Sequence, residues 1–130
     1  MTEAVLNQQE VTKKNISQLL SQLTNTYQNT RSERKEIATQ FFPENEEFSL
    51  LEEIELLTVN LRGYASQIAA NSQIINKDQV ISQLQGMRVF SVSQIGEFYF
   101  NNNGKYEQMK SYIRMLDYLR LLLLEYLQSV

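Results

Sequence analysis

The sequence contains no histidine and no cysteine, and these two absences remove much of the chemistry that small proteins use. Without cysteine, the chain has neither disulfide bonds nor thiolate metal ligands. Without histidine, it cannot form an imidazole zinc site, a Ser-His-Asp or Cys-His catalytic group, or the histidine-and-carboxylate di-iron site of some helical bundles. We therefore expect a protein without a metal or another cofactor.

Proline and glycine are also scarce, with one proline and four glycines in 130 residues. So few breaks favour long helices over many short strands. The 42% hydrophobic content is enough for a buried core. No apolar run reaches the roughly 18 residues of a membrane span, and the first residues lack the basic and then apolar pattern of a signal peptide. We expect a cytoplasmic protein with one domain at residues 13–130, after a polar, frayed segment at residues 1–12.

The strongest helical pattern lies in residues 106–127. Its apolar side chains recur at three- and four-residue steps, which places them on one side of a helix. These residues are Tyr106, Met109, Ile113, Leu116, Leu119, Leu123 and Leu127. Further apolar residues widen the stripe, so we expect several neighbouring helices to bury it. Charged residues with the same spacing predict an exposed, self-neutralising face: Glu107, Lys110, Arg114, Asp117 and Arg120.

The first predicted helix is interrupted by polar residues. A stripe from Ile16 to Tyr27 gives way to a polar segment at residues 28–36 and resumes at Ile37. A continuous helical register places Thr30 and Arg34 on the buried side. We therefore favour a helix with a polar waist, and a hinge is the alternative. Pro43 would end this helix.

The second predicted helix has a regular apolar stripe, formed by Leu50, Ile54, Leu57, Leu61, Ala65 and Ile68. Ser49 and Glu52 have the spacing of a capping box, although Asn45 could start the helix one turn earlier. The helix should end near Ala70.

The third predicted helix starts at Asn76, which forms a capping-box variant with Gln79. Its stripe is Val80, Ile81, Leu84, Met87, Val92, Ile95 and Phe98. Residues 87–94 alternate as a strand would, but no partner strand is evident, so we interpret them as helical. The turn at residues 101–104 should end this helix, with Gly104 or an asparagine in the left-handed conformation.

Four helices with short connections predict an all-α, up-down-up-down antiparallel four-helix bundle. The net charge is −3, and residues 43–75 hold six acidic side chains and one basic one. This balance argues against a general nucleic-acid binder, which would have a basic excess.

One cluster of basic residues has two interpretations. Arg31, Arg34 and Lys35 could form a solvated face together with Glu33 and Glu36, or they could contact phosphates. The complete set of candidate nucleic-acid or partner contacts is Arg31, Arg34, Lys35, Arg88, Lys110 and Arg114.

An enzyme is the less favoured interpretation. Glu52, Glu53 and Glu55 point in different helical directions, and their position near a helix start is typical of compensation for the helix dipole. Aromatic side chains favour an interaction protein instead, because they exceed what one small core must bury. They are Tyr64, Tyr99, Phe100, Tyr106, Tyr112, Tyr118 and Tyr126. We therefore expect a homo-oligomer that also recruits a protein partner.

Residues 42–50 read Phe-Pro-Glu-Asn-Glu-Glu-Phe-Ser-Leu. Phe-Pro ends the first predicted helix, an acidic link follows, and Phe-Ser-Leu opens the second predicted helix with its apolar stripe. This arrangement resembles the four-helix-bundle family of 23S rRNA intervening-sequence proteins, which includes the accessory variability proteins of diversity-generating retroelements. Residues 67–71 correspond to the family's Asn-Ile-Ala-Glu-Gly segment but lack its Glu-Gly ending, and Glu97 matches a glutamate of its third helix.

The resemblance covers about residues 16–127. It implies a bundle that assembles into a homopentameric barrel. For the retroelement members it also implies association with a reverse transcriptase and with RNA or DNA, although those members are basic and this chain is acidic. An accessory nucleic-acid-binding factor is accordingly the alternative function.

Overall fold

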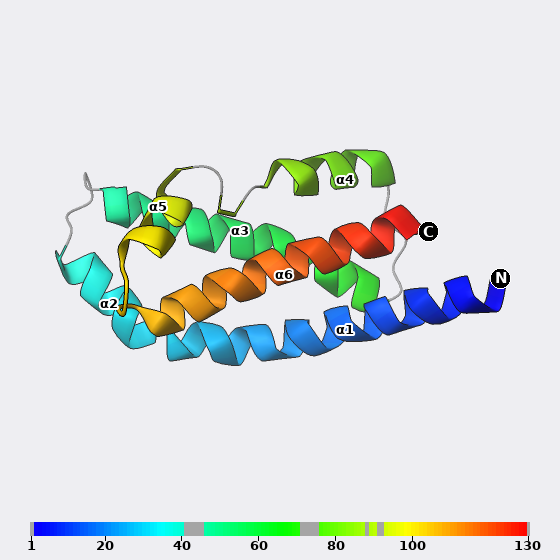
Figure 1. The fold of residues 1–130 in the computed structure, drawn as a ribbon, viewed down its shortest axis with the longest axis horizontal. Coiled ribbons are helices and arrows are strands. Elements are labelled where there is room, and N and C mark those ends of the chain that lie inside the picture. The colour runs from blue at the N-terminus through cyan, green and yellow to red at the C-terminus, as the bar shows by residue number, and fades with distance from the viewer. Residues whose placement is uncertain (1, 41–45, 71–75, 88, 91–92, 130) are drawn as a thin grey trace.

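The computed structural model describes residues 2–40, 46–70, 76–87, 89–90 and 93–129 (Figure 1). Within these ranges the chain forms six α-helices and no strand, which confirms the all-α prediction. The helices are α1 (Thr2–Asn29), α2 (Arg31–Gln40), α3 (Glu46–Ala69), α4 (Lys77–Gly86), α5 (Ser93–Asn101) and α6 (Glu107–Ser129). None of these helices has both the length and the apolar character that a membrane crossing requires.

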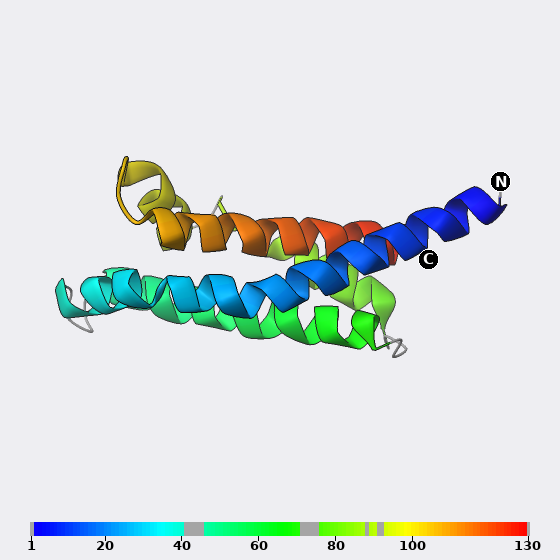
Figure 2. The same cartoon turned by 90° about the horizontal axis from the view of Figure 1, so that it is seen from below.

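Helix α6 lies at the centre of the arrangement. It packs against α1, α2, α3 and α4, while α3 also contacts α1, α2 and α5. Figure 1 shows α1 and α2 following one another along one side of the molecule, with α3 running in the opposite direction. The start of α1 projects beyond the C-terminal end of α6 in both views (Figure 2).

The inner face of α6 is the stripe that the sequence predicts. Its six members within α6 are buried, namely Met109, Ile113, Leu116, Leu119, Leu123 and Leu127, whereas Tyr106 precedes the helix, with φ 57°, and is partly buried. The predicted stripe of α3 is buried too, except for Leu57, which packs against the core from its edge. Burial from several sides explains how a helix this apolar is stable in water.

The polar waist of the first predicted helix is a one-residue interruption. Thr30 is fully buried between α1 and α2, and its N–H donates to the carbonyl oxygen of Tyr27 at 3.0 Å. Its hydroxyl donates to the same oxygen at 2.6 Å, and the helix resumes with the Arg34 N–H bonded to the Thr30 carbonyl. The interruption is thus a single turn that satisfies its own polar groups, and not an open hinge.

Helix α1 also extends into the segment that we expected to be frayed. Thr12 is buried, its hydroxyl donates to the Gln8 carbonyl at 3.0 Å, and Gln9 donates to the Ser129 carbonyl at 2.7 Å. The bond between Gln9 and Ser129 joins α1 to the end of α6, and because it is polar, an apolar period could not reveal it.

The prediction of one continuous third helix is wrong. Helix α4 ends at Gly86, where the Met87 N–H closes the last turn, and Val89 and Phe90 form a turn before α5. The break buries Val89 and places the Phe90 ring 4.9 Å from the Tyr99 ring of α5. Glycine is a weak helix former, so Gly86 favours the end of α4, and the apolar packing of Val89 and Phe90 favours the same break. Val92 lies outside the described residues.

The predicted helix boundaries are right more often than the predicted capping bonds. Asn76 does precede α4, but it has φ 58° and its side chain makes no capping hydrogen bond. Helix α3 begins at Glu46, so Ser49 lies inside it and the earlier start is correct, although Asn45 and Pro43 lie outside the described residues. Gly104 has φ +74°, as the turn signal predicts.

Candidate functional site

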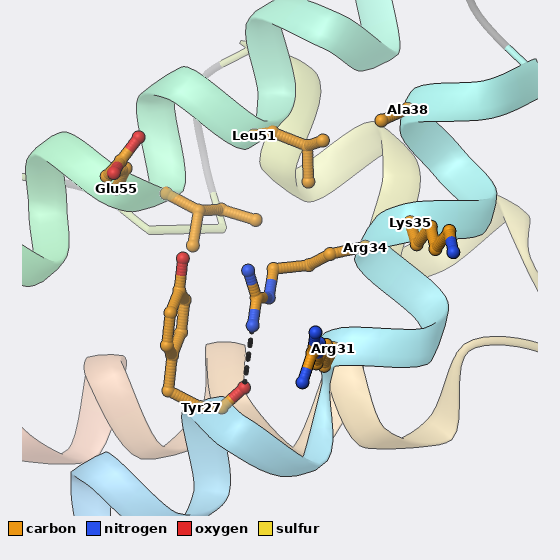
Figure 3. A pocket seen from close by; sticks show the side chains of 8 residues that line it. Tyr27, Arg31, Arg34, Lys35, Ala38, Leu51 and Glu55 are labelled. Atoms are coloured by element: carbon orange, nitrogen blue, oxygen red, sulfur yellow. Dashed lines mark hydrogen bonds between the residues drawn. The ribbon is translucent and has the colours of Figure 1, made fainter.

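A cleft of about 420 Å³ lies between α2 and α3 and contains the predicted basic cluster (Figure 3). Three basic side chains from two successive turns of α2 line it, together with one ring from α1 and one acid from α3. The lining residues are Tyr27, Arg31, Arg34, Lys35, Ala38, Leu51, Ile54 and Glu55. With three cations and one anion, its lining has a net charge of +2.

Arg34 has the most constrained side chain in the cleft. Its Nε donates to the Thr30 hydroxyl at 2.8 Å and its Nη2 donates to the Tyr27 carbonyl at 3.3 Å. The guanidinium carbon also lies 4.0 Å from the centre of the Tyr27 ring, a cation–π contact. Figure 3 shows this side chain reaching from α2 toward Tyr27, whereas Arg31 and Lys35, both exposed, do not point at the ring.

Glu33, on the same helix, holds α2 against the start of α6. Its carboxylate accepts hydrogen bonds from the backbone N–H groups of Gln108, at 3.1 Å, and Met109, at 2.7 Å. These groups belong to the first turn of α6, where a helix has unsatisfied donors and its dipole favours negative charge. Sequence reasoning missed this cap because the residues are far apart in the chain.

Tyr112 connects the cleft to the core. Its ring lies 5.1 Å from the Tyr27 ring, and its hydroxyl is 2.8 Å from the Thr58 hydroxyl. Burial raises the pKa of Tyr112 above its ordinary value of 10.0, although the hydrogen bond with Thr58 opposes the shift. The shift favours the neutral phenol, and the nearby charge of Arg34 opposes it.

Two further candidate contacts lie at the junction of α5 and α6, not in the cleft. Lys110 is buried, contrary to the exposed face predicted for it, because its ammonium group donates to the Asn102 carbonyl. Arg114 is exposed and donates to the Tyr99 hydroxyl at 2.9 Å. The six candidates thus do not form one surface: three line the cleft, two lie at this junction, and Arg88 lies outside the described residues.

The other three charged residues of the predicted α6 face, Glu107, Asp117 and Arg120, have different surroundings. Asp117 and Arg120 form an ion pair at 3.2 Å, and Arg120 also donates to the carbonyl of Leu84 at the end of α4. Arg120 thereby ties α6 to α4, a structural role. Glu107 is exposed, as predicted.

The outward faces of α3 and α6 carry large apolar side chains. The exposed fractions are 64% for Leu56 and 63% for Val59 on α3, and 55% for Tyr118 and 51% for Leu121 on α6. A hollow of about 290 Å³ adjoins Leu56, and Leu57, Met87 and Ile95 are among the other residues that line it. Of the predicted interface aromatics, Tyr112 is buried and Phe100 is 63% exposed.

The three glutamates at the start of α3 do not converge on a site. Glu55 lines the cleft, Glu53 lines the hollow beside Leu56, and Glu52 is exposed. In the described part of the chain, no group of three or more acidic side chains could hold a metal ion.

Comparisons of the chain with family models, with curated proteins and with solved structures found no match. Inferences about its function therefore depend on the chemistry of its own surfaces.

Proposed function

We propose that this protein is a non-enzymatic interaction module that self-associates through the outward faces of α3 and α6. The observation that carries the proposal is a pair of exposed stripes with the same spacing. Glu52, Leu56 and Val59 lie at successive steps of four and three residues on α3. Arg114, Tyr118 and Leu121 have the same steps on α6, and the two stripes begin with opposite charges.

The two stripes are complementary when α3 of one copy lies parallel to α6 of another. Glu52 then faces the second copy's Arg114, while Leu56 faces Tyr118 and Val59 faces Leu121. Steps of four and three residues are those of helices that pack along an extended seam. Exposed apolar side chains gain free energy when such a seam removes them from water, and the charged pair fixes the register. The hollow beside Leu56 gives space for the Tyr118 ring.

A contact between two different faces is heterologous, so it forms either a closed ring or an open chain of copies. An open chain leaves one α3 face and one α6 face uncovered at its ends. A protein partner with a stripe of either kind would bind there by the same contacts. We also propose that each copy is an up-down-up-down four-helix bundle. In this bundle α1 and α2 together form the first, interrupted helix, α3 is the second, α4 and α5 together form the third, and α6 is the fourth.

The alternative function is that of an accessory factor that binds RNA or DNA, as the family resemblance implies. In its favour, Arg31, Lys35 and Arg114 are exposed. We rank it second because Arg34 is bonded to Tyr27 and Thr30, and Lys110 is buried against Asn102. If this alternative holds, a mobility shift with single-stranded RNA at low salt should appear and should weaken steeply with added salt.

The proposed function is tested by light scattering after size-exclusion chromatography. The chain alone has a mass of 15.2 kDa, and we expect a multiple of it at micromolar concentrations. Leu56→Gln should shift the protein toward the monomer. Val11→Gln is the matched control, because Val11 is 52% exposed but lies on α1 and outside both stripes. A wild-type protein that stays strictly monomeric contradicts the proposal.

A further inference from the structure

The cleft between α2 and α3 presents two chemically different walls. Helix α2 contributes Arg31, Arg34 and Lys35, while α3 contributes the apolar side chains of Leu51 and Ile54. Glu55 is the only carboxylate in the described lining, and Figure 3 shows it on α3, apart from Arg34. An opening of about 420 Å³ lies within the range of small-molecule sites.

The guanidinium of Arg34 has no anionic partner among the described residues. Its bonds go to two neutral oxygens, on Thr30 and Tyr27, and none of the carboxylates whose side chains the structure describes forms an ion pair with it. A partly buried cation without a counter-charge costs free energy, and an anion that enters the cleft would recover part of that cost.

The same contacts hold the guanidinium in place before any ligand arrives. The Tyr27 ring supports one side of it, and Tyr112 supports Tyr27 from the core. Glu33 fixes α2 through the N-terminus of α6, so the wall that carries Arg34 is attached to the central helix. A pre-organised cation binds an anion with a smaller loss of conformational entropy than a free side chain does.

We propose that this cleft binds a small organic anion with an apolar body. Its carboxylate or phosphate group is held by Arg31 and Arg34, and its body lies against Leu51 and Ile54. The cationic wall selects the charge, since guanidinium groups make strong charge-assisted hydrogen bonds to both kinds of anion. The apolar wall selects against ions that lack a hydrophobic portion. None of the six residues of the self-association stripes is needed, so this proposal stands apart from the proposed function.

Calorimetry and amide NMR shifts with hexanoate and hexyl phosphate test the site. We expect both probes to bind, with shifts at Arg31 and Lys35. Acetate and inorganic phosphate should bind at least about tenfold more weakly, because they lack the apolar body, a loss of the size expected for several buried methylenes. Hexylammonium, with the opposite charge, should not bind. The tighter of the two hexyl probes tells whether the natural ligand is a carboxylate or a phosphate ester.

Substitutions separate the site from general adsorption. Arg31→Gln, at an exposed position, should leave the fold intact and weaken hexanoate binding about tenfold, as expected for one charge-assisted bond. Lys105→Gln removes an exposed charge outside the cleft and should leave binding unchanged. Three results would each overturn the proposal: no binding of either hexyl probe, equal binding of acetate and hexanoate, or binding unaffected by Arg31→Gln. Displacement of hexyl phosphate by a tighter-binding oligonucleotide would also overturn it, in favour of a nucleic-acid site.

Discussion

The inner and outer faces of α6 are built from the same residue types and have opposite surroundings. Leu116 is fully buried in the core, whereas Leu121, five residues later, is half exposed. Tyr112 is fully buried with its hydroxyl against Thr58, whereas Tyr118 is 55% exposed. The inner leucine and tyrosine pack in the core, whereas the outer pair belongs to the α6 stripe of the proposed self-association. Matched substitutions on the two faces can therefore separate stability from association.

The largest effect should come from the inner leucine. Leu116→Ala removes side-chain atoms from the centre of the core and should lower the free energy of unfolding by about 2–5 kcal/mol. Leu121→Ala should change it by no more than about 0.5 kcal/mol, because that side chain is half exposed. Urea denaturation followed by circular dichroism measures both values. Equal losses for the two variants would remove the distinction between the faces.

Two glycines extend the comparison beyond α6. A Cβ atom at Gly96 would overlap the carbonyl oxygen of Phe90, so Gly96→Ala forces the turn at residues 89–90 to move and should cost about 1–3 kcal/mol. Gly63, on the outward face of α3, has nothing within 4 Å of such an atom. Gly63→Ala should therefore stabilise the protein by about 0.5–1 kcal/mol. Thermal melts of both variants give the sign of each stability change. Stabilisation by Gly96→Ala would contradict the described turn.

Removal of the Glu33 cap at the N-terminal end of α6 should have an intermediate effect on stability. Glu33→Ala leaves the N–H groups of Gln108 and Met109 without their acceptor and should cost about 0.5–2 kcal/mol, as for other lost helix caps. Amide hydrogen exchange should become faster at these two residues first. Unchanged protection at both would show that Glu33 does not cap α6 in solution.

Tyr112 and Tyr118 of α6 give the smallest effect, and it depends on pH. Because burial raises the folded-state pKa of Tyr112, its contribution to stability is fully present below pH 10.0, the unfolded value, and is lost as pH rises through the folded value. Tyr112→Phe should lose about 0.5–1.5 kcal/mol at neutral pH with its hydrogen bond, and should show less alkaline destabilisation than the wild type.

Tyr118→Phe is the control for this titration. Its ring is more than half exposed, so the variant should keep the alkaline loss of stability that the wild type shows. An alkaline loss that persists in Tyr112→Phe and disappears in Tyr118→Phe would reverse the assignment of the two faces.

The inner face could be predicted from the sequence because apolar residues at helical spacing report burial directly. The same reasoning failed for Lys110, since its spacing matched a charged surface while its partners, Asn102 and Tyr99, belong to the α5 side of the junction. The break after Gly86 was also missed. A single glycine and a few β-branched residues are weak local signals, and the packing of Phe90 on α5 decides the outcome.

The candidate site was predictable only in part, because the sequence pattern reports neighbours on one helix and not the packing of separate helices. Arg31, Arg34 and Lys35 come together because they are neighbours on one helix, which the sequence shows. The apolar wall of the cleft and the cap by Glu33 depend on how separate helices pack, which local periodicity does not encode.

Binding between the outward α3 face of one copy and the outward α6 face of another can be tested by a charge exchange. Sedimentation equilibrium would compare the wild type with Glu52→Arg, with Arg114→Glu and with the double variant. We predict that each single substitution weakens association by placing like charges opposite one another, and that the double variant restores it. A double variant that associates no better than either single one would show that these two faces do not meet.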